Sequence, residues 1–223
     1  MRAGCPPNWQ DLEDDVDLWD LIEIAEDGLP TAWVPRKEVL KDLLAAADDT
    51  ARRQVFCDRR DEILEDCRTA LKEVTSAELA EYVDMLDEAL TVAEAGHLAA
   101  AQAFAASIFD TVIRREIKPQ KLNGYYGKVK EEIQARHENA NMSELRWGVV
   151  FIPAVDVLEK FDAPKGDPVP EKFNRHASAH AVGKVQYTET NTVIALARST
   201  SMVREAHEQI VEAPPPAAGG TTP

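Results

Sequence analysis

The chain has 223 residues, of which 44% are hydrophobic and 6% are aromatic, enough for one large domain with a buried core. Its 40 acidic and 25 basic side chains give a net charge of −15, and the excess acid lies in the first hundred residues, which hold 25 acidic and 10 basic groups. So acidic a part repels nucleic acid. No apolar run approaches the roughly 20 residues that span a bilayer, so no membrane partner is expected.

The first residues and the cysteines indicate where the protein works. Residues 1–10 include two prolines and no apolar core of the kind that a secretion signal needs. The three cysteines, Cys5, Cys57 and Cys67, are odd in number, and none belongs to a Cys-x-x-Cys motif. Reduced thiols fit this pattern best, and we expect a cytoplasmic protein.

Helical periodicity begins after a short irregular start. Residues 11–25 mix acids with apolar side chains, in a short helix or a partly extended segment, and Gly28-Leu29-Pro30 ends them. Apolar stripes then predict helices over 36–47 and 50–74. Ser76 is a suitable N-cap for a further helix through Ala95, which Gly96 closes.

The second part of the chain continues the helical pattern. We expect helices over 97–117, 125–136, 143–160 (interrupted near Pro153), 171–181 and 187–211, with a loop at 162–170. No β-hairpin signature is present, so the fold class is all-α, a helical bundle. We divide the chain into an acidic N-terminal helical extension (1–75), a bundle (76–212) and a disordered tail (213–223) rich in Pro, Gly and Thr.

The segment from Asn174 to His180, Asn-Arg-His-Ala-Ser-Ala-His, concentrates groups suited to phosphate chemistry. Asn174 is a strong N-cap type, and the free amides of a helix start favour an anion. The guanidinium of Arg175 matches phosphate oxygens, and a histidine exchanges protons near neutral pH. His176 and His180 have the spacing of a helical zinc pair, but the Glu of a His-Glu-x-x-His motif and a third ligand are missing, so we expect no metal.

These residues, placed between a Pro-rich loop and a long apolar helix, resemble the catalytic motif of HEPN ribonucleases (higher eukaryotes and prokaryotes nucleotide-binding domain), including those of abortive-infection systems. Upstream, residues 96–113 resemble the helix of related bundles that carries an inward acidic residue, here Asp110. The likeness covers roughly residues 80–212. It implies a HEPN-like bundle acting as a homodimer, in which two motif helices form one cleft.

The resemblance also implies the chemistry. The RNA 2′-hydroxyl attacks the adjacent phosphorus without a metal or another cofactor. His180 acts as general base or acid, and Arg175 stabilises charge on the phosphoryl oxygens. Asn174 and His176 orient the phosphoryl group. Asp110 positions Arg175, unless it pairs only with Arg114, one helical turn away.

A basic stretch offers candidates for RNA binding. Between residues 114 and 130 the charged side chains are basic apart from one glutamate. Tyr125 and Tyr126 stand close to Lys128 and Lys130, so bases could stack beside phosphate-binding lysines. The alternative is a solvated helix end covered by two tyrosines.

The expected function is therefore an endoribonuclease of a defence or toxin type, with RNA, a second copy and an antitoxin or regulatory protein as partners. Two alternatives stay open: a non-catalytic helical interaction module that keeps the fold, and an acidic regulatory protein whose N-terminal part carries the function. For a ribonuclease of net charge −15, either the acidic part covers the site until a partner is met, or a narrow cleft captures the substrate.

Overall fold

The computed structural model describes residues 5–10, 12, 18–116, 141–158 and 161–212. Every regular element in these ranges is a helix, which confirms the all-α fold class. The helices, with η for a 3₁₀ turn, are η1 (Pro7–Trp9), α1 (Leu18–Glu26), α2 (Lys37–Ala45), α3 (Asp49–Asp58), α4 (Arg60–Lys72), η2 (Ala77–Leu79), α5 (Ala80–Glu94), α6 (Leu98–Glu116), α8 (Met142–Phe151), α9 (Ala154–Val157), η3 (Ala163–Lys165), α10 (Arg175–His180) and α11 (Glu189–Glu212).

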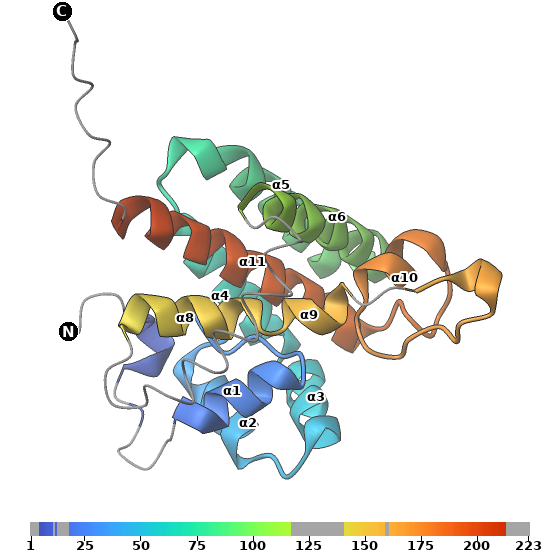
Figure 1. Ribbon diagram of the computed structural model, residues 1–223, viewed down its shortest axis with the longest axis horizontal. Coiled ribbons are helices and arrows are strands. Elements are labelled where there is room, and N and C mark those ends of the chain that lie inside the picture. Colours follow the sequence, from blue (N-terminus) through green and yellow to red (C-terminus); the bar gives the residue numbers. More distant parts are fainter. Residues whose placement is uncertain (1–4, 11, 13–17, 117–140, 159–160, 213–223) are drawn as a thin grey trace, which may run out of the picture.

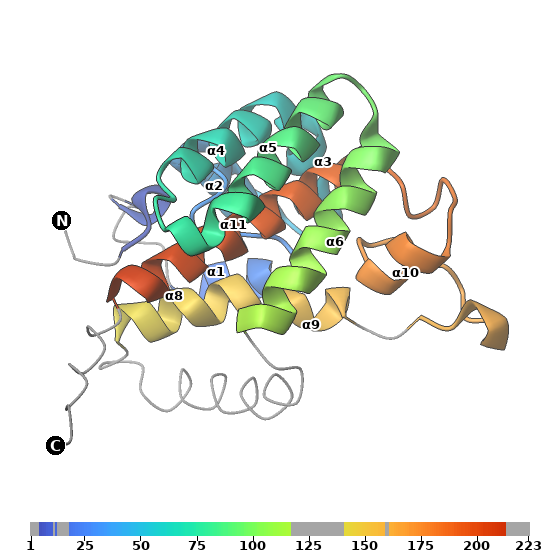
Figure 2. The ribbon, with the colours of Figure 1, turned by 90° about the horizontal axis from the view of Figure 1, so that it is seen from above.

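The last helix, α11, runs through the middle of the molecule. Helices α5 and α6 lie on one side of it, and α1, α2 and α3 lie on the other (Figure 1). Small hydroxyl side chains let neighbouring backbones approach it: Ser199 Oγ donates to the carbonyl of Ala105 at 3.1 Å, and Ser201 Oγ donates to that of Ala32 at 2.9 Å. α11 is buried along most of its length, because α3, α4, α5, α6 and α8 all pack against it. The view from above also shows its central position (Figure 2).

Several predicted boundaries are confirmed. The helix over 36–47 is α2, the helix over 97–117 is α6, and the interruption near Pro153 separates α8 from α9. Gly96 closes α5 with a φ of +84°, a backbone conformation that is unfavourable for residues with a Cβ atom. The expected helix over 125–136 and the tail from 213 lie outside the described residues.

Two details of the helical pattern are wrong. The single helix predicted over 50–74 is two helices, because Arg59 leaves helical geometry with φ −102° and ψ 20°. Its guanidinium pairs with Glu62 and with Asp42 of α2, contacts that the apolar stripe does not encode. Ser76 makes no side-chain cap; its Oγ instead lies 2.7 Å from Nδ1 of His207.

The acidic N-terminal part shares its core with the rest of the chain. Buried Ile24, Leu40 and Phe56 belong to the same hydrophobic cluster as Phe109 and Leu196. The boundary at residue 75 therefore does not separate two cores, and it stays a prediction about sequence organisation. Among the described helices, none is long and apolar enough to span a membrane.

A buried ion pair joins α8 to α11. Arg146 and Glu205 are both 0% exposed, and Nε of the arginine lies 2.6 Å from Oε2 of the glutamate. Glu205 also accepts hydrogen bonds from Trp33 Nε1 at 3.0 Å and from Gln209 Nε2 at 2.6 Å. Burial raises the pKa of Glu205, while these donors oppose the rise. This pair links three distant segments of the chain.

Candidate functional site

The motif singled out in the sequence forms the short helix α10, at one end of the molecule (Figure 1). Asn174 is the N-cap, as expected, and its side-chain oxygen accepts a hydrogen bond from the amide of Ala177 at 2.8 Å. The helix spans six residues, fewer than the eleven expected over 171–181. Asn174 itself is 4% exposed, so it faces the interior and satisfies the helix start from within the chain.

A buried polar network holds the inner side of α10. Gln102 of α6 donates through Nε2 to Ser178 Oγ at 3.1 Å and to Gln186 Oε1 at 3.2 Å. Gln186 in turn donates to the carbonyls of Pro170 and Lys172. Both glutamines are fully buried, and the Tyr187 hydroxyl donates to the carbonyl of Ser178. The network fixes the short helix against α6, which its own length could not do.

Replacing Gln102 with leucine should cost about 1–3 kcal/mol of unfolding free energy, because it leaves Ser178 and Gln186 buried with fewer partners. It should also speed hydrogen exchange of the α10 amides. Gln54→Leu, on the exposed side of α3, is the matched control and should change both quantities little. If the two variants had equal effects on urea unfolding and on hydrogen exchange, the role of the network would be contradicted.

Arg175 points from α10 towards α6. Its Nη2 lies 2.8 Å from Oδ2 of Asp110, and the same oxygen lies 2.8 Å from Nε of Arg114. The Asp110 carboxylate is 13% exposed, and the arginines are 21% (Arg175) and 59% (Arg114) exposed. Asp110 therefore holds two guanidiniums together, and both of the contacts considered for it from the sequence are present.

The two histidines of α10 occupy different surroundings. His180 is exposed and His176 is half-buried. The pKa of His176 is lowered, first by burial and then by electrostatic interaction with Arg175 and His180; Asp110 opposes the shift, and Arg114 adds a smaller lowering effect. Burial and the charge of Arg175 therefore favour the neutral form of the His176 imidazole.

Histidines with lowered pKa values predict a loss of stability in mild acid. Burial also lowers the pKa of His207, which lies beside Arg204. In mild acid the unfolded chain therefore binds more protons than the folded chain. The unfolding free energy should be highest above the usual histidine pKa of about 6.5 and should fall as the pH drops below it. Urea unfolding between pH 7.5 and 6.0 measures this. The slope should flatten in His207→Gln, and an unchanged slope would contradict the assignment.

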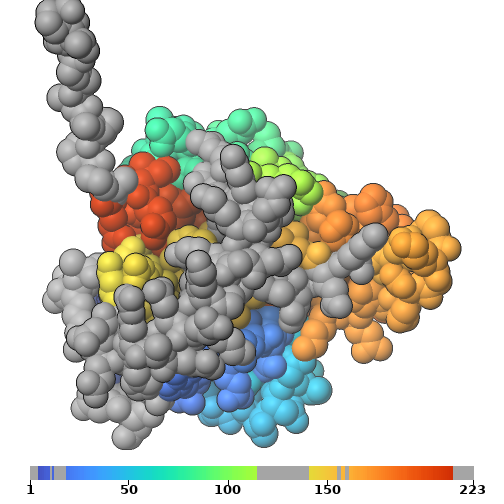
Figure 3. Space-filling view, in the orientation of Figure 1, coloured from blue at the N-terminus to red at the C-terminus, as the bar shows by residue number. Residues whose placement is uncertain are grey.

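The outer side of α10 is exposed at Ala179 and His180. In the space-filling view, the segment that carries α10 lies at one edge of the molecule, beside the end of α6 (Figure 3). Because His180 is exposed, the described part of the acidic segment does not cover it. Arg175 and His180 are five residues apart, which places them about 140° apart around a helix. One copy thus presents its guanidinium towards α6 and its exposed imidazole towards another side.

The expected RNA-binding residues, Tyr125, Tyr126, Lys128 and Lys130, lie outside the described ranges. In the part of the chain that the structure describes, no three His, Cys, Asp or Glu side chains gather in a way that could hold a metal ion. Sequence reasoning missed Gln102 and Gln186; a glutamine within the alanine run of 99–106 was the available signal.

Comparison with known proteins found no matching family model, no similar curated protein and no similar solved structure.

Proposed function

We propose that the chain is a metal-independent endoribonuclease of HEPN type, acting in the cytoplasm at the surface shared by α10 and the end of α6. The observation that carries the proposal is the cluster around Asp110. Two guanidiniums, Arg175 and Arg114, lie on one carboxylate at 2.8 Å, and the pKa of His176, the next residue after Arg175, is lowered by burial and by the charge of Arg175. Such a cluster suits a phosphodiester, since the guanidiniums have further donors for phosphoryl oxygens.

The proposed reaction is an internal displacement on RNA. The 2′-hydroxyl oxygen attacks the adjacent phosphorus and gives its proton to a base, and the 5′-oxygen leaves as it takes a proton from an acid. The products are a 2′,3′-cyclic phosphate and a 5′-hydroxyl. His180 supplies the general base or acid, His176 orients the phosphate, and Arg175 stabilises the charge that develops on the phosphoryl oxygens.

A homodimer would complete the site. Because Arg175 and His180 point about 140° apart around α10, two α10 helices facing each other would bring the guanidinium of one copy near the imidazole of its partner. The exposure of His180 supports this arrangement, since its ring is available to a second copy. A defence or toxin role, and control by an antitoxin or regulatory protein, belong to the same proposal.

The test is cleavage of single-stranded RNA by the purified chain in the presence of EDTA. The wild type should cut RNA, and His180→Ala should lower the rate by about 10²–10⁴-fold, the usual contribution of an acid or base. The control is His97→Ala, because His97 is an exposed histidine immediately before α6 that is not part of the motif. Equal rates for these variants would contradict the proposal, and a folded wild type that binds partners without cutting any RNA would favour the non-catalytic interaction module.

The dimer has a separate test. Mixing Arg175→Ala with His180→Ala protein should restore part of the activity, because a mixed dimer would keep one intact pair of groups. Analytical ultracentrifugation gives the oligomeric state of the same samples. Activity in a monomeric sample, or no recovery in a mixture shown to contain mixed dimers, would contradict the shared site.

A further inference from the structure

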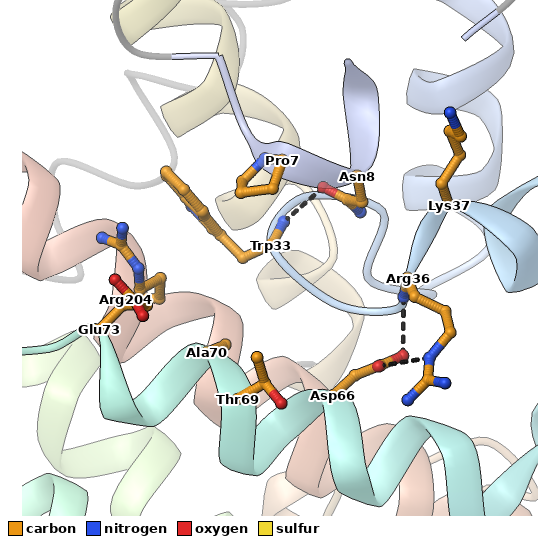
Figure 4. A pocket seen from close by; sticks show the side chains of 10 residues that line it. All are labelled: Pro7, Asn8, Trp33, Arg36, Lys37, Asp66, Thr69, Ala70, Glu73 and Arg204. Carbon is orange, nitrogen blue, oxygen red and sulfur yellow. Dashed lines mark hydrogen bonds and ion pairs between the residues drawn. The ribbon is translucent and has the colours of Figure 1, made fainter. Parts of the chain in front are cut away.

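A cleft of about 390 Å³ lies on another part of the molecule, between η1, the connection from Trp33 to Lys37, and the helices α4 and α11 (Figure 4). None of the residues that line it belongs to α6 or α10. Its volume is within the range of sites that hold small organic molecules. It is therefore a candidate binding site separate from the α10 surface.

The walls of the cleft are already fixed. The Trp33 backbone N–H donates to Asn8 Oδ1 at 3.2 Å, and the indole Nε1 donates to Glu205 at 3.0 Å. The Arg204 guanidinium lies 4.3 Å from the centroid of the Trp33 ring. Asn8 Nδ2 donates to the carbonyls of Thr31 and Pro35, each at 2.8 Å. A ligand would therefore meet a preformed surface, which lowers the entropic cost of binding.

The charges in the wall are mostly neutralised. Asp66 accepts from the Arg36 backbone N–H at 2.7 Å and from its Nε at 2.6 Å (Figure 4), and Arg204 pairs with Glu208. Glu73 differs, because its side chain makes no hydrogen bond or ion pair with a residue in the described ranges, although its charge acts on His207. It lies at the end of the cleft where Trp33 and Arg204 are drawn (Figure 4).

Lys37 is also without an ion pair to a described residue, but its ammonium extends away from α4 in the same view (Figure 4). Glu73 is therefore the carboxylate of the wall that is left for a ligand. The first hundred residues, with 25 acidic and 10 basic side chains, also raise the local concentration of cations and lower that of anions. Charge complementarity thus favours a cationic occupant.

We propose that this cleft binds a small organic cation. Its apolar body packs against Trp33, Pro7 and Ala70, and its ammonium group pairs with Glu73. The site is independent of the proposed ribonuclease function.

The test compares three probes of one shape with the full chain: phenethylammonium, 2-phenylethanol and phenylacetate. Two-dimensional NMR should show saturable shifts at Trp33, Ala70 and Glu73 with the amine, weaker binding of the alcohol and the weakest binding of the acid. Glu73→Gln should lower the affinity for the amine by up to about fivefold, to the level of the alcohol. Glu81→Gln, an exposed glutamate of α5 outside the cleft, should leave it unchanged.

A second variant tests the cavity itself. Thr69 is exposed on α4 and lines the cleft, so Thr69→Phe should fill it and abolish binding of all three probes while the chain stays folded. Equal affinities for amine and acid, shifts located elsewhere, or amine binding that survives in folded Thr69→Phe would overturn the proposal. If Thr69→Phe does not fold, the Glu73→Gln comparison decides.

Discussion

Arg175→Ala is expected to lower the rate of RNA cleavage by about 10²–10³-fold, the usual cost of removing one group that stabilises a developing oxyanion. The side chain lies 2.8 Å from Asp110 and keeps further donors for a phosphate. Arg175→Lys should recover only part of the rate, because lysine keeps the positive charge but lacks the planar fork of a guanidinium. Single-turnover kinetics on labelled RNA measures these effects.

The control for this prediction is Lys184→Ala. Lys184 is an exposed cation in the turn after α10, so its removal lowers the local positive charge without touching Asp110. The rate should fall by no more than a few fold at moderate salt. Arg175→Ala protein that is folded and cleaves at the wild-type rate would show that Arg175 has no part in the reaction.

Arg146→Leu should lower the unfolding free energy by about 3–5 kcal/mol, because it leaves the carboxylate of Glu205 buried without its counterion. Both side chains are 0% exposed, and the arginine also reaches Glu212 at 3.0 Å. The double variant Arg146→Leu/Glu205→Leu should recover much of the loss, since an apolar pair avoids the cost of burying charge. Urea unfolding at pH 7 measures all three proteins.

The matched comparison is Arg68→Leu. Arg68 pairs with Glu94 at 2.9 Å, and the two side chains are 24% and 46% exposed. A pair so accessible to solvent contributes under about 1 kcal/mol. If Arg146→Leu costs no more than Arg68→Leu, the buried pair does not stabilise the fold as argued.

The sequence predicts helices well where the signal is local. Gly96, Pro153 and Asn174 mark the end of a helix, an interruption and a start, because each acts on the backbone next to it. The break at Arg59 lies in a charged run, residues 58–62, between two apolar stripes. Such a run is also typical of a solvated helix turn, so it does not by itself predict where α3 ends and α4 begins.

Buried polar residues are the main features that periodicity cannot find. Arg146 and Glu205 are 59 positions apart, and Gln102 and Gln186 are 84 positions apart. Each alone is typical of a solvated helix face, and burial becomes favourable only when the distant partner is present. His207 is a further example: it is 6% exposed, and its Nδ1 lies 2.7 Å from Ser76 Oγ, 131 positions away.

The candidate site was predictable in part. Asn174 predicts the capped start of the motif helix, and that cap is present. The expected contact between Asp110 and Arg175 is also present. The short length of α10 and the grouping of Arg114 with Arg175 on one carboxylate depend on how α10 packs against α6. The sequence alone gives no distance between those elements.

The central claim is that Arg175 and His180 cut RNA through its own 2′-hydroxyl. The most direct measurement uses a DNA oligonucleotide that contains a single ribonucleotide, incubated with the purified chain in EDTA and analysed by mass spectrometry. We expect cleavage only on the 3′ side of the ribonucleotide, leaving a 2′,3′-cyclic phosphate, and no cleavage by the folded double variant Arg175→Ala/His180→Ala. Cleavage at deoxyribonucleotides, or equal cleavage by the double variant, would contradict the account.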